Sequence, residues 1–220
     1  NGLSACLVSP PAGMLSTVTT PTPSLPEHSN PTVVRLFEAA ADAFADKGFH
    51  ATTTRDIASR AGLSPAGVYV HFTSKEDLLF QLSRVGHEAA RDDLAAAAAA
   101  ADSPPHALAE VISAFARWHA EQHQVARIVQ YEFRHLSPDH QREVLTLRRE
   151  IDGVVERIIA EGVASGDFHV TDTRATALAA LSLVVDVARW YHPGIRRTTP
   201  EQIGRTYGAL ALRLVGARAS

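Results

Sequence analysis

Polar residues that can cap the start of an α-helix recur along this sequence, and they constrain its fold more than any other feature. Three of the capping side chains are followed directly by proline, which is favoured at the first position of an α-helix. The capping residues are Asn30, Ser64, Ser74 and Thr199. Five helices are expected in the second half of the chain, over residues 105–122, 124–135, 138–165, 172–191 and 200–216. From Pro31 onward the chain therefore predicts an all-α fold of about nine helices.

The length and composition suit a globular protein with a substantial core. The chain has 220 residues, of which 45% are hydrophobic and 20% are charged, and a domain typically needs about 100–200 residues. Residues 1–30 hold five prolines and no lysine or arginine. They predict a disordered tail, followed by one domain over residues 31–78 and a second over residues 79–217.

Several classes of protein are excluded by what the sequence lacks. The single cysteine, Cys6, rules out an internal disulfide framework and favours the reducing cytoplasm. No run of about 18 uncharged apolar residues occurs, so no membrane span is expected. Phosphate-loop, nucleophile-elbow and dinucleotide motifs are absent, so we expect neither an enzyme nor a cofactor. His119 and His123 share a helix face, but no third ligand is near, so no metal site is predicted.

Residues 52–72 predict two short helices joined by a tight turn. Thr52-Thr53-Thr54 precedes the first helix, over residues 55–61, and Ser64 caps the second, over residues 65–72. Gly62 supplies a backbone conformation in the turn that other residues resist. This spacing is typical of a helix-turn-helix, whose second helix enters the major groove of DNA. An ordinary helix corner shows the same spacing.

Residues 36–79 closely resemble the DNA-binding domain of the TetR family of transcriptional repressors. The most specific stretch is Tyr-x-His-Phe-x-Ser-Lys-Glu at residues 69–76. The resemblance implies an all-helical homodimer, with an N-terminal three-helix DNA-binding domain and a separate helical regulatory domain. It also implies that DNA binding is lost when a small molecule enters the regulatory domain.

The predicted DNA contacts combine three kinds of residue. Hydroxyl groups at helix starts can hold phosphates, small residues allow close approach to base edges, and the resemblance assigns backbone contacts to a tyrosine, a histidine and a lysine. The predicted DNA-binding residues are Thr54, Arg55, Ser64, Pro65, Ala66, Gly67, Tyr69, His71 and Lys75. Residues 31–78 hold five basic and six acidic groups, and residues 65–71 hold no lysine or arginine. We therefore expect base reading to depend on Arg55 and on apolar contacts.

Two C-terminal segments predict a dimer interface. Residues 175–191 are apolar on nearly every face, which predicts a helix buried on all sides, in part by a partner outside the domain. In the next helix, Gly204 and Gly208 permit close approach of another helix. Together these helices predict a four-helix interface in a two-fold dimer, which would read a near-palindromic operator. The predicted interface residues are Leu178, Leu181, Val185, Trp190, Ile203, Tyr207, Leu210 and Leu214.

A ligand pocket is predicted among the first three regulatory helices and the long fourth helix of the N-terminal part. The predicted ligand-binding residues are Phe115, Trp118, His119, Ile128, Tyr131, Glu132 and Asp186, with Phe133 as further lining. Asp186 is an acid in an apolar helix and needs a partner, for which Arg189 is the candidate. Plain core packing is the alternative for each of these residues.

Residues 188–194, with the sequence ARWYHPG, are similar to a TetR subgroup that controls the breakdown of fatty acids, steroids or aromatic acids. That resemblance implies an acyl-CoA effector, whose phosphates would need cations. The candidate cations are Arg127, Arg134, Arg148, Arg149, Arg196 and Arg197. A drug-efflux regulator is the alternative within the family.

These observations predict a cytoplasmic, dimeric repressor whose partners are double-stranded DNA and a small hydrophobic effector. The alternative is a helical enzyme or small-molecule carrier that does not bind DNA. Its support is the net charge of −3, which leaves no general basic surface for nucleic acid.

Overall fold

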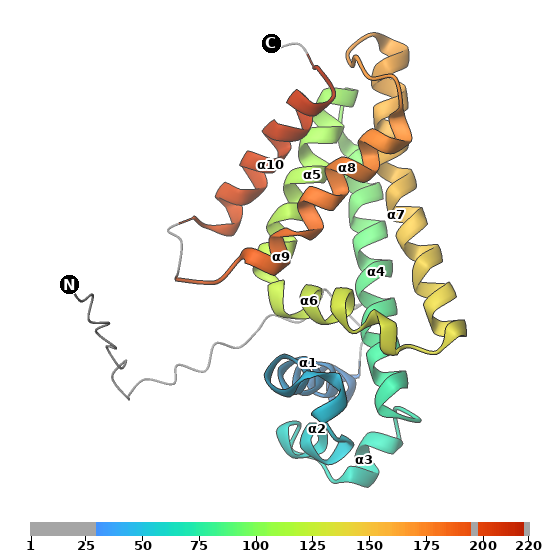
Figure 1. The fold of residues 1–220 in the computed structure, drawn as a ribbon, viewed down its shortest axis with the longest axis vertical. Helices are drawn as coiled ribbons and strands as arrows, with labels where there is room; N and C mark the ends of the chain where they lie inside the picture. Colours follow the sequence, from blue (N-terminus) through green and yellow to red (C-terminus); the bar gives the residue numbers. More distant parts are fainter. Residues whose placement is uncertain (1–29, 195–197, 218–220) are drawn as a thin grey trace, which may run out of the picture.

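The computed structural model describes residues 30–194 and 198–217, and every element within these ranges is helical (Figure 1). The elements are α1 (Pro31–Ala51), α2 (Thr54–Arg60), α3 (Pro65–Tyr69), α4 (Lys75–Ala100), α5 (Pro104–Glu121), α6 (His123–Tyr131), the 3-10 helix η1 (Phe133–His135), α7 (Pro138–Ser165), α8 (Thr173–Val185), α9 (Val187–Trp190) and α10 (Pro200–Leu214). The prediction of an all-α fold is confirmed. The predicted tail, apart from Asn30, lies outside the described residues.

Local capping chemistry explains where the N-terminal helices begin. The Asn30 side chain accepts a hydrogen bond from the backbone N–H of Thr32, and the Ser64 side chain accepts one from Gly67. Thr53, rather than its neighbour Thr54, caps α2, in a reciprocal capping box with Asp56. Each cap satisfies a backbone donor that the first turn of a helix leaves without an intrahelical partner.

Positive backbone φ angles separate the helices of the N-terminal domain at two glycines. Gly48, with φ 74°, breaks α1 near its end, and Gly62, with φ 67°, forms the turn between α2 and α3. Both positions favour glycine because a Cβ atom would be strained there. The predicted turn geometry of the helix-turn-helix is therefore present.

The N-terminal core extends beyond residue 78, the predicted domain boundary. Leu36, Ile57 and Leu78 are fully buried in a cluster that also includes Ile128 of α6 and Val144 of α7. The end of α6 and the start of α7 thus pack against the helix-turn-helix domain. In Figure 1, α6 lies across the molecule between α1 and the upper helices.

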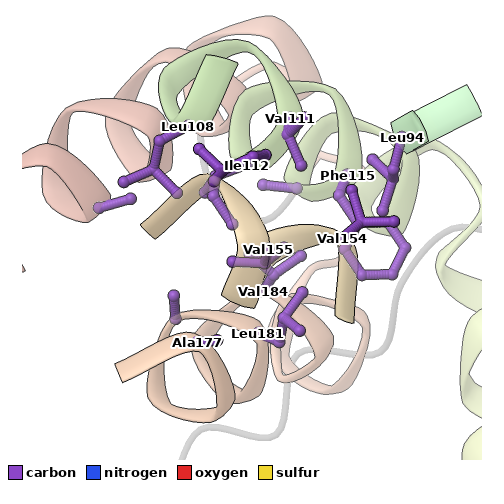
Figure 2. Packing of buried hydrophobic residues seen from close by; sticks show 14 of the residues in the cluster. Leu94, Leu108, Val111, Ile112, Phe115, Val154, Val155, Ala177, Leu181 and Val184 are labelled. Atoms are coloured by element: carbon purple, nitrogen blue, oxygen red, sulfur yellow. The ribbon is translucent and has the colours of Figure 1, made fainter. Parts of the chain in front are cut away.

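A second core holds the regulatory helices together. Figure 2 shows Ile112 of α5, Val155 of α7 and Val184 of α8 close together near its centre, with Leu94 of α4 at one side of the same cluster. Helix α4 contributes to both cores, as does α7, so these two long helices connect the two halves of the molecule.

Helix α10 packs closely on α5 of the same chain through its two glycines. A Cβ atom on Gly204 would lie 2.7 Å from the carbonyl oxygen of Ser113, and one on Gly208 would collide with Ser113 and with the carbonyl oxygen of Ala109. The close approach that these glycines permit is therefore an intrachain contact, whereas the sequence predicted it for the dimer interface.

The predicted helix over residues 172–191 is divided in two. Asp186 follows the last residue of α8 and precedes α9, and its backbone N–H bonds back to the carbonyls of Ser182 and Val184. Leu178 and Leu183 are 44% and 52% exposed in the single chain, so burial of this helix on every side depends on the partner that the sequence predicts, and that part stays a prediction. In the described part of the chain, no helix is both long enough and apolar enough to cross a bilayer.

Candidate nucleic-acid interface and ligand cavity

The end of the molecule formed by α2 and α3 presents an uncovered surface (Figure 1). Tyr69 is 55% exposed and Val70 is 77% exposed, which is unusual for side chains of this size. Most of the predicted DNA-binding residues share this exposure. Arg55, Ser64, Pro65, Ala66 and Tyr69 are exposed, and Thr54, Gly67 and His71 are partly buried.

A hydrogen bond joins the two short helices at this surface. The hydroxyl oxygens of Thr54 and Tyr69 lie 3.2 Å apart. The sequence predicted Thr54 as a helix cap, but Thr53 takes that role and leaves the Thr54 hydroxyl free to reach α3. The contact orients the Tyr69 hydroxyl on the face that would meet a phosphate backbone.

Most cations of the N-terminal domain already have partners. The Lys47 ammonium lies 2.8 Å from Asp56, and the Arg60 guanidinium lies 2.6 Å from Asp46. Arg55 of α2 is exposed, and in the described structure no carboxylate pairs with it. The predicted contact of Arg55 with DNA stays a prediction.

Lys75 has a different role from the predicted phosphate contact. Its Nζ donates hydrogen bonds to the carbonyl oxygens of Phe49 at 2.5 Å and Thr52 at 2.7 Å. The ammonium also lies 4.3 Å from the centroid of the Phe49 ring, and burial lowers its pKa. Lys75 thus holds the end of α1 against the start of α4, and we correct its assignment as a DNA contact accordingly.

The regulatory half contains a cavity of about 500 Å³ between α4, α5, α6, α7, α8 and α9. This volume falls within the range of small-molecule sites. Five of the predicted ligand-binding residues line it: Phe115, Trp118, His119, Tyr131 and Asp186. The described cavity wall does not include Ile128, which is buried in the N-terminal core, nor Glu132, whose carboxylate lies 3.2 Å from His135. Phe133 packs against that core too.

The predicted partner of Asp186 is confirmed. Arg189 donates from Nε to Oδ1 of Asp186 at 2.5 Å and from Nη2 to Oδ2 at 2.7 Å. These hydrogen bonds lower the pKa of Asp186. Both residues line the cavity, so its wall includes a bidentate ion pair.

Several residues predicted for the dimer interface lie elsewhere in the single chain. Leu178, Leu181 and Val185 border the cavity, and Ile203 is 1% exposed in the regulatory core. Trp190 and Tyr207 are partly buried. Leu210 and Leu214, with exposures of 41% and 42%, remain free on the surface of α10.

Sequence reasoning missed the pairing of two polar residues in the cavity wall. Arg148 of α7 donates from Nε to Nε2 of His87 of α4 at 3.2 Å. The sequence named Arg148 only as one of six candidate cations for the phosphates of an acyl-CoA, and it did not single out His87. Their sequence separation of 61 positions leaves no local signal of the pairing.

Two histidines with helical spacing do not form a metal site in the described residues. His119 is buried, its Nδ1 lies 2.9 Å from the carbonyl oxygen of Phe115, and burial lowers its pKa to about 4. Nδ1 of His123 lies 3.1 Å from the carbonyl oxygen of Ala120. No group of three or more metal-ligating side chains occurs in the described ranges.

Contacts between the cavity helices and the DNA-binding domain are concentrated at one junction. One carboxylate oxygen of Glu76, in the first turn of α4, lies 2.8 Å from Nδ1 of His140 and accepts a 2.8 Å hydrogen bond from the backbone N–H of Ser137. The His135 ring of η1 stacks on the ring of Phe49, with centroids 5.2 Å apart. Movement of α6, η1 or α7 would therefore reach both α1 and α4.

Two family models together match most of the chain. Residues 36–82 match the bacterial regulatory proteins of the tetR family, and residues 101–215 match the tetracyclin repressor-like C-terminal domain. The chain belongs to the TetR family. Its helix-turn-helix and cavity-bearing domain are thus the DNA-binding and regulatory parts of a TetR-family protein.

Relatives within the TetR family cover nearly the whole chain. The transcriptional repressor KstR2 of Mycolicibacterium smegmatis is 33% identical over 181 residues, which are 80% of this chain and 87% of the relative. A TetR-family regulatory protein from Rhodococcus RHA1 has a TM-score of 0.77 at 39% identity, and the match covers 87% of this chain and 100% of that structure. The structure of AibR in complex with isovaleryl coenzyme A and operator DNA has the same fold. Its TM-score is 0.74 at 20% identity, with 85% of this chain and 100% of AibR covered.

Proposed function

We propose that this TetR-family protein is a transcriptional repressor that binds a near-palindromic operator and releases it when a small hydrophobic effector fills the cavity. The observation that carries the proposal is the combination, in one chain, of an uncovered surface formed by α2, which bears Arg55, and α3, and an effector-sized cavity, with α4 extending between them. The KstR2 relative is a transcriptional repressor, which supports the same assignment.

The proposed repressor acts as a homodimer. Leu183 of α8 and Leu210 and Leu214 of α10 are large apolar side chains that are 41–52% exposed in the single chain. Helices α8 and α10 contact each other, so these side chains extend across one part of the surface. A second copy would cover them, and its two-fold symmetry would present two copies of α3 to successive turns of the operator.

Release follows from a shift between two conformations. An effector that binds more tightly to a state with unsuitably spaced α3 helices draws the population away from the DNA-binding state. The junction of Glu76, His140 and Ser137 supports this mechanism, because it ties the start of α7 to the start of α4.

We infer that the effector belongs to the chemistry of fatty-acid, steroid or aromatic-acid breakdown, with an acyl-CoA thioester as the leading class. The AibR complex shows that this fold can hold a coenzyme A thioester and operator DNA. Arg127 and Arg148 at the cavity could meet anionic groups, whereas Arg196 and Arg197 lie outside the described residues. A drug-efflux regulator would instead respond to uncharged or cationic compounds. Release by a thioester but not by its free acid supports the acyl-CoA class.

The proposal places the protein in the cytoplasm with DNA and gives it no enzymatic activity. Its test is binding to DNA from beside its own gene at several salt concentrations. A sequence-selective complex that weakens steeply with salt supports the repressor. Absence of any complex at low salt would favour the alternative, a helical small-molecule carrier or enzyme.

A further inference from the structure

We infer that the effector carries an anionic group and that Arg148, inside the cavity, is the residue that binds it. The inference rests on the proposed function, because it identifies a chemical feature of the molecule that triggers release. It also assigns Arg148 a second role, as the link between the occupied cavity and the DNA-binding domain.

In the part of the chain that the structure describes, Arg148 forms no ion pair, although Asp152, one turn further along α7 and also in the cavity wall, acts on its charge at longer range. Its guanidinium donates to Nε2 of His87 at 3.2 Å and to the carbonyl oxygen of Val129 at 3.3 Å, and it lies 4.7 Å from the centroid of the Phe133 ring. Among the described residues, no carboxylate lies within 4.0 Å of it. Burial lowers the pKa of Arg148, which reflects the cost of placing this cation away from water.

His87 orients the guanidinium without neutralising it. Nδ1 of His87 lies 2.7 Å from the carbonyl oxygen of Ser83, so Nδ1 carries the proton and Nε2 accepts from Arg148. Burial lowers the pKa of His87 to about 4, which keeps the ring uncharged at neutral pH. The Nη1 group of Arg148 makes no hydrogen bond within the described structure, so its two N–H donors are available to a ligand.

Other cations at the cavity are less suited to this role. Arg189 is already bound to both carboxylate oxygens of Asp186, and Arg127 is exposed. Around Arg148 the wall is largely apolar and includes Phe115 and Trp118. The cavity is therefore suited to an apolar molecule with one anionic group, either a carboxylate or a phosphate, because a planar guanidinium binds both in a bidentate manner.

The same contacts connect Arg148 to the junction with the DNA-binding domain. Val129 is near the end of α6, and Phe133 is the first residue of η1. An anion that pairs with Arg148 competes with the Val129 carbonyl and the Phe133 ring for the guanidinium. Loss of these two contacts would loosen η1, whose His135 stacks on Phe49 of α1.

The experiment measures ligand binding to the full chain and to two variants. The probes are decanoate, cholanate, the methyl ester of each acid, and decanoyl-CoA. Binding is measured by calorimetry and by tryptophan fluorescence, to which Trp118 of the cavity wall and Trp190 both contribute. Arg148→Met removes the proposed anion-binding group. Arg157→Met is the matched control, because Arg157 is exposed on the same helix and does not line the cavity.

The wild-type chain should bind at least one acid, or the thioester, about 10-fold more tightly than the matching ester. Arg148→Met should weaken the binding of that ligand roughly 10- to 100-fold and leave the affinity for the ester unchanged, because only the charge-assisted contact is lost. Arg157→Met should behave as the wild type. If the acids show this effect, the anion is a carboxylate, and if decanoyl-CoA alone shows it, the anion is a phosphate. Arg148→Lys, which keeps the charge, should restore part of the preference if Arg148→Met fails to fold.

Equal binding of acid, ester and thioester to the wild type overturns the inference, as does failure of every anionic probe to bind. An equal loss of affinity for acid and ester in Arg148→Met would show that Arg148 supports the structure of the cavity and does not bind the anion. Operator binding is measured on the same preparations. A wild-type chain that binds anions through Arg148 but binds no DNA would refute the proposed function and leave this inference standing.

Discussion

The hydroxyl oxygens of Thr54 and Tyr69 lie 3.2 Å apart, so a hydrogen bond joins the start of α2 to the end of α3 on the surface proposed to meet DNA. Tyr69→Phe should lower operator affinity about 2- to 10-fold, because one hydrogen-bonding group near the backbone is lost. Fluorescence anisotropy with labelled operator measures this change. In a double-mutant cycle with Thr54→Val the two effects should be less than additive, and strict additivity would show that the pair does not act as a unit.

Arg55, in α2, is an exposed cation that has no carboxylate partner in the described structure. Arg55→Ala should weaken specific operator binding by about 1–3 kcal/mol if the side chain reads a base edge. Arg60→Ala is the control, because it removes the same charge from a residue paired with Asp46. Equal losses of operator affinity in the two variants, with equal changes in its salt dependence, would indicate a general electrostatic effect instead of a contact with a specific base.

The exposed leucines of α10 make the proposed dimer testable. Leu210→Glu should convert the protein to monomers, because it places a charge in the centre of an apolar interface. Light scattering coupled to size-exclusion chromatography reports the mass. Leu145→Glu changes a comparably exposed leucine on α7 and should leave the dimer intact. A dimeric Leu210→Glu protein would mean that copies associate through another surface.

Stability should fall as the pH is lowered from about 6.5 to about 4. Burial lowers the pKa of His119 and of His87 to about 4 in the folded protein, whereas an unfolded histidine has a pKa near 6.5. The unfolded chain therefore binds more protons in this interval, and the free energy of unfolding decreases by up to ~3 kcal/mol for each histidine. Above about pH 6.5 both states are neutral and this stability is fully present.

Urea denaturation at several pH values measures this dependence. His119→Gln should reduce the slope between pH 6.5 and 4, since one of the two buried groups is gone. His169→Gln is the control, because His169 is exposed. An unchanged slope in His119→Gln would assign the acid sensitivity to other groups.

The glycine contact between α10 and α5 should be intolerant of a methyl group. Gly208→Ala places a Cβ atom against Ser113 and the Ala109 carbonyl, and overpacking of this kind costs about 1–3 kcal/mol. The nearest atom to a Cβ atom on Gly153, in α7, would be Nη1 of Arg157 at 3.5 Å, an ordinary contact. Gly153→Ala should therefore raise the melting temperature, since alanine favours helix by ~1 kcal/mol, while Gly208→Ala lowers it. A melting temperature of Gly208→Ala at or above that of the wild type would show that α10 is free to shift.

Features that depend on local chemistry could be predicted from the sequence. The caps at Asn30, Ser64, Ser74 and Thr199, and the turn glycine Gly62, act over a few neighbouring residues and mark where helices begin or turn. The ion pair of Asp186 and Arg189 was found for the same reason, because one helical turn separates the two residues.

Features that depend on how helices pack could not be predicted in the same way. An apolar pattern identified α8 as a buried helix, but it did not show which leucines border the cavity and which face outward. Gly204 and Gly208 indicated a close helix contact without indicating that the neighbour is α5. Arg148 and His87 are adjacent only because α4 and α7 pack side by side.

Helix α4 has 26 residues and belongs to both hydrophobic cores. At about 1.5 Å per residue it is roughly 39 Å long. It therefore works as a lever, in which a tilt of about 5° near Leu94 displaces the far end, roughly 28 Å away, by about 2.5 Å, most of the ~3.4 Å spacing of stacked bases. A side-chain rearrangement too small to change the outline of the regulatory half would therefore be enough to move α3 out of register with the bases of its operator.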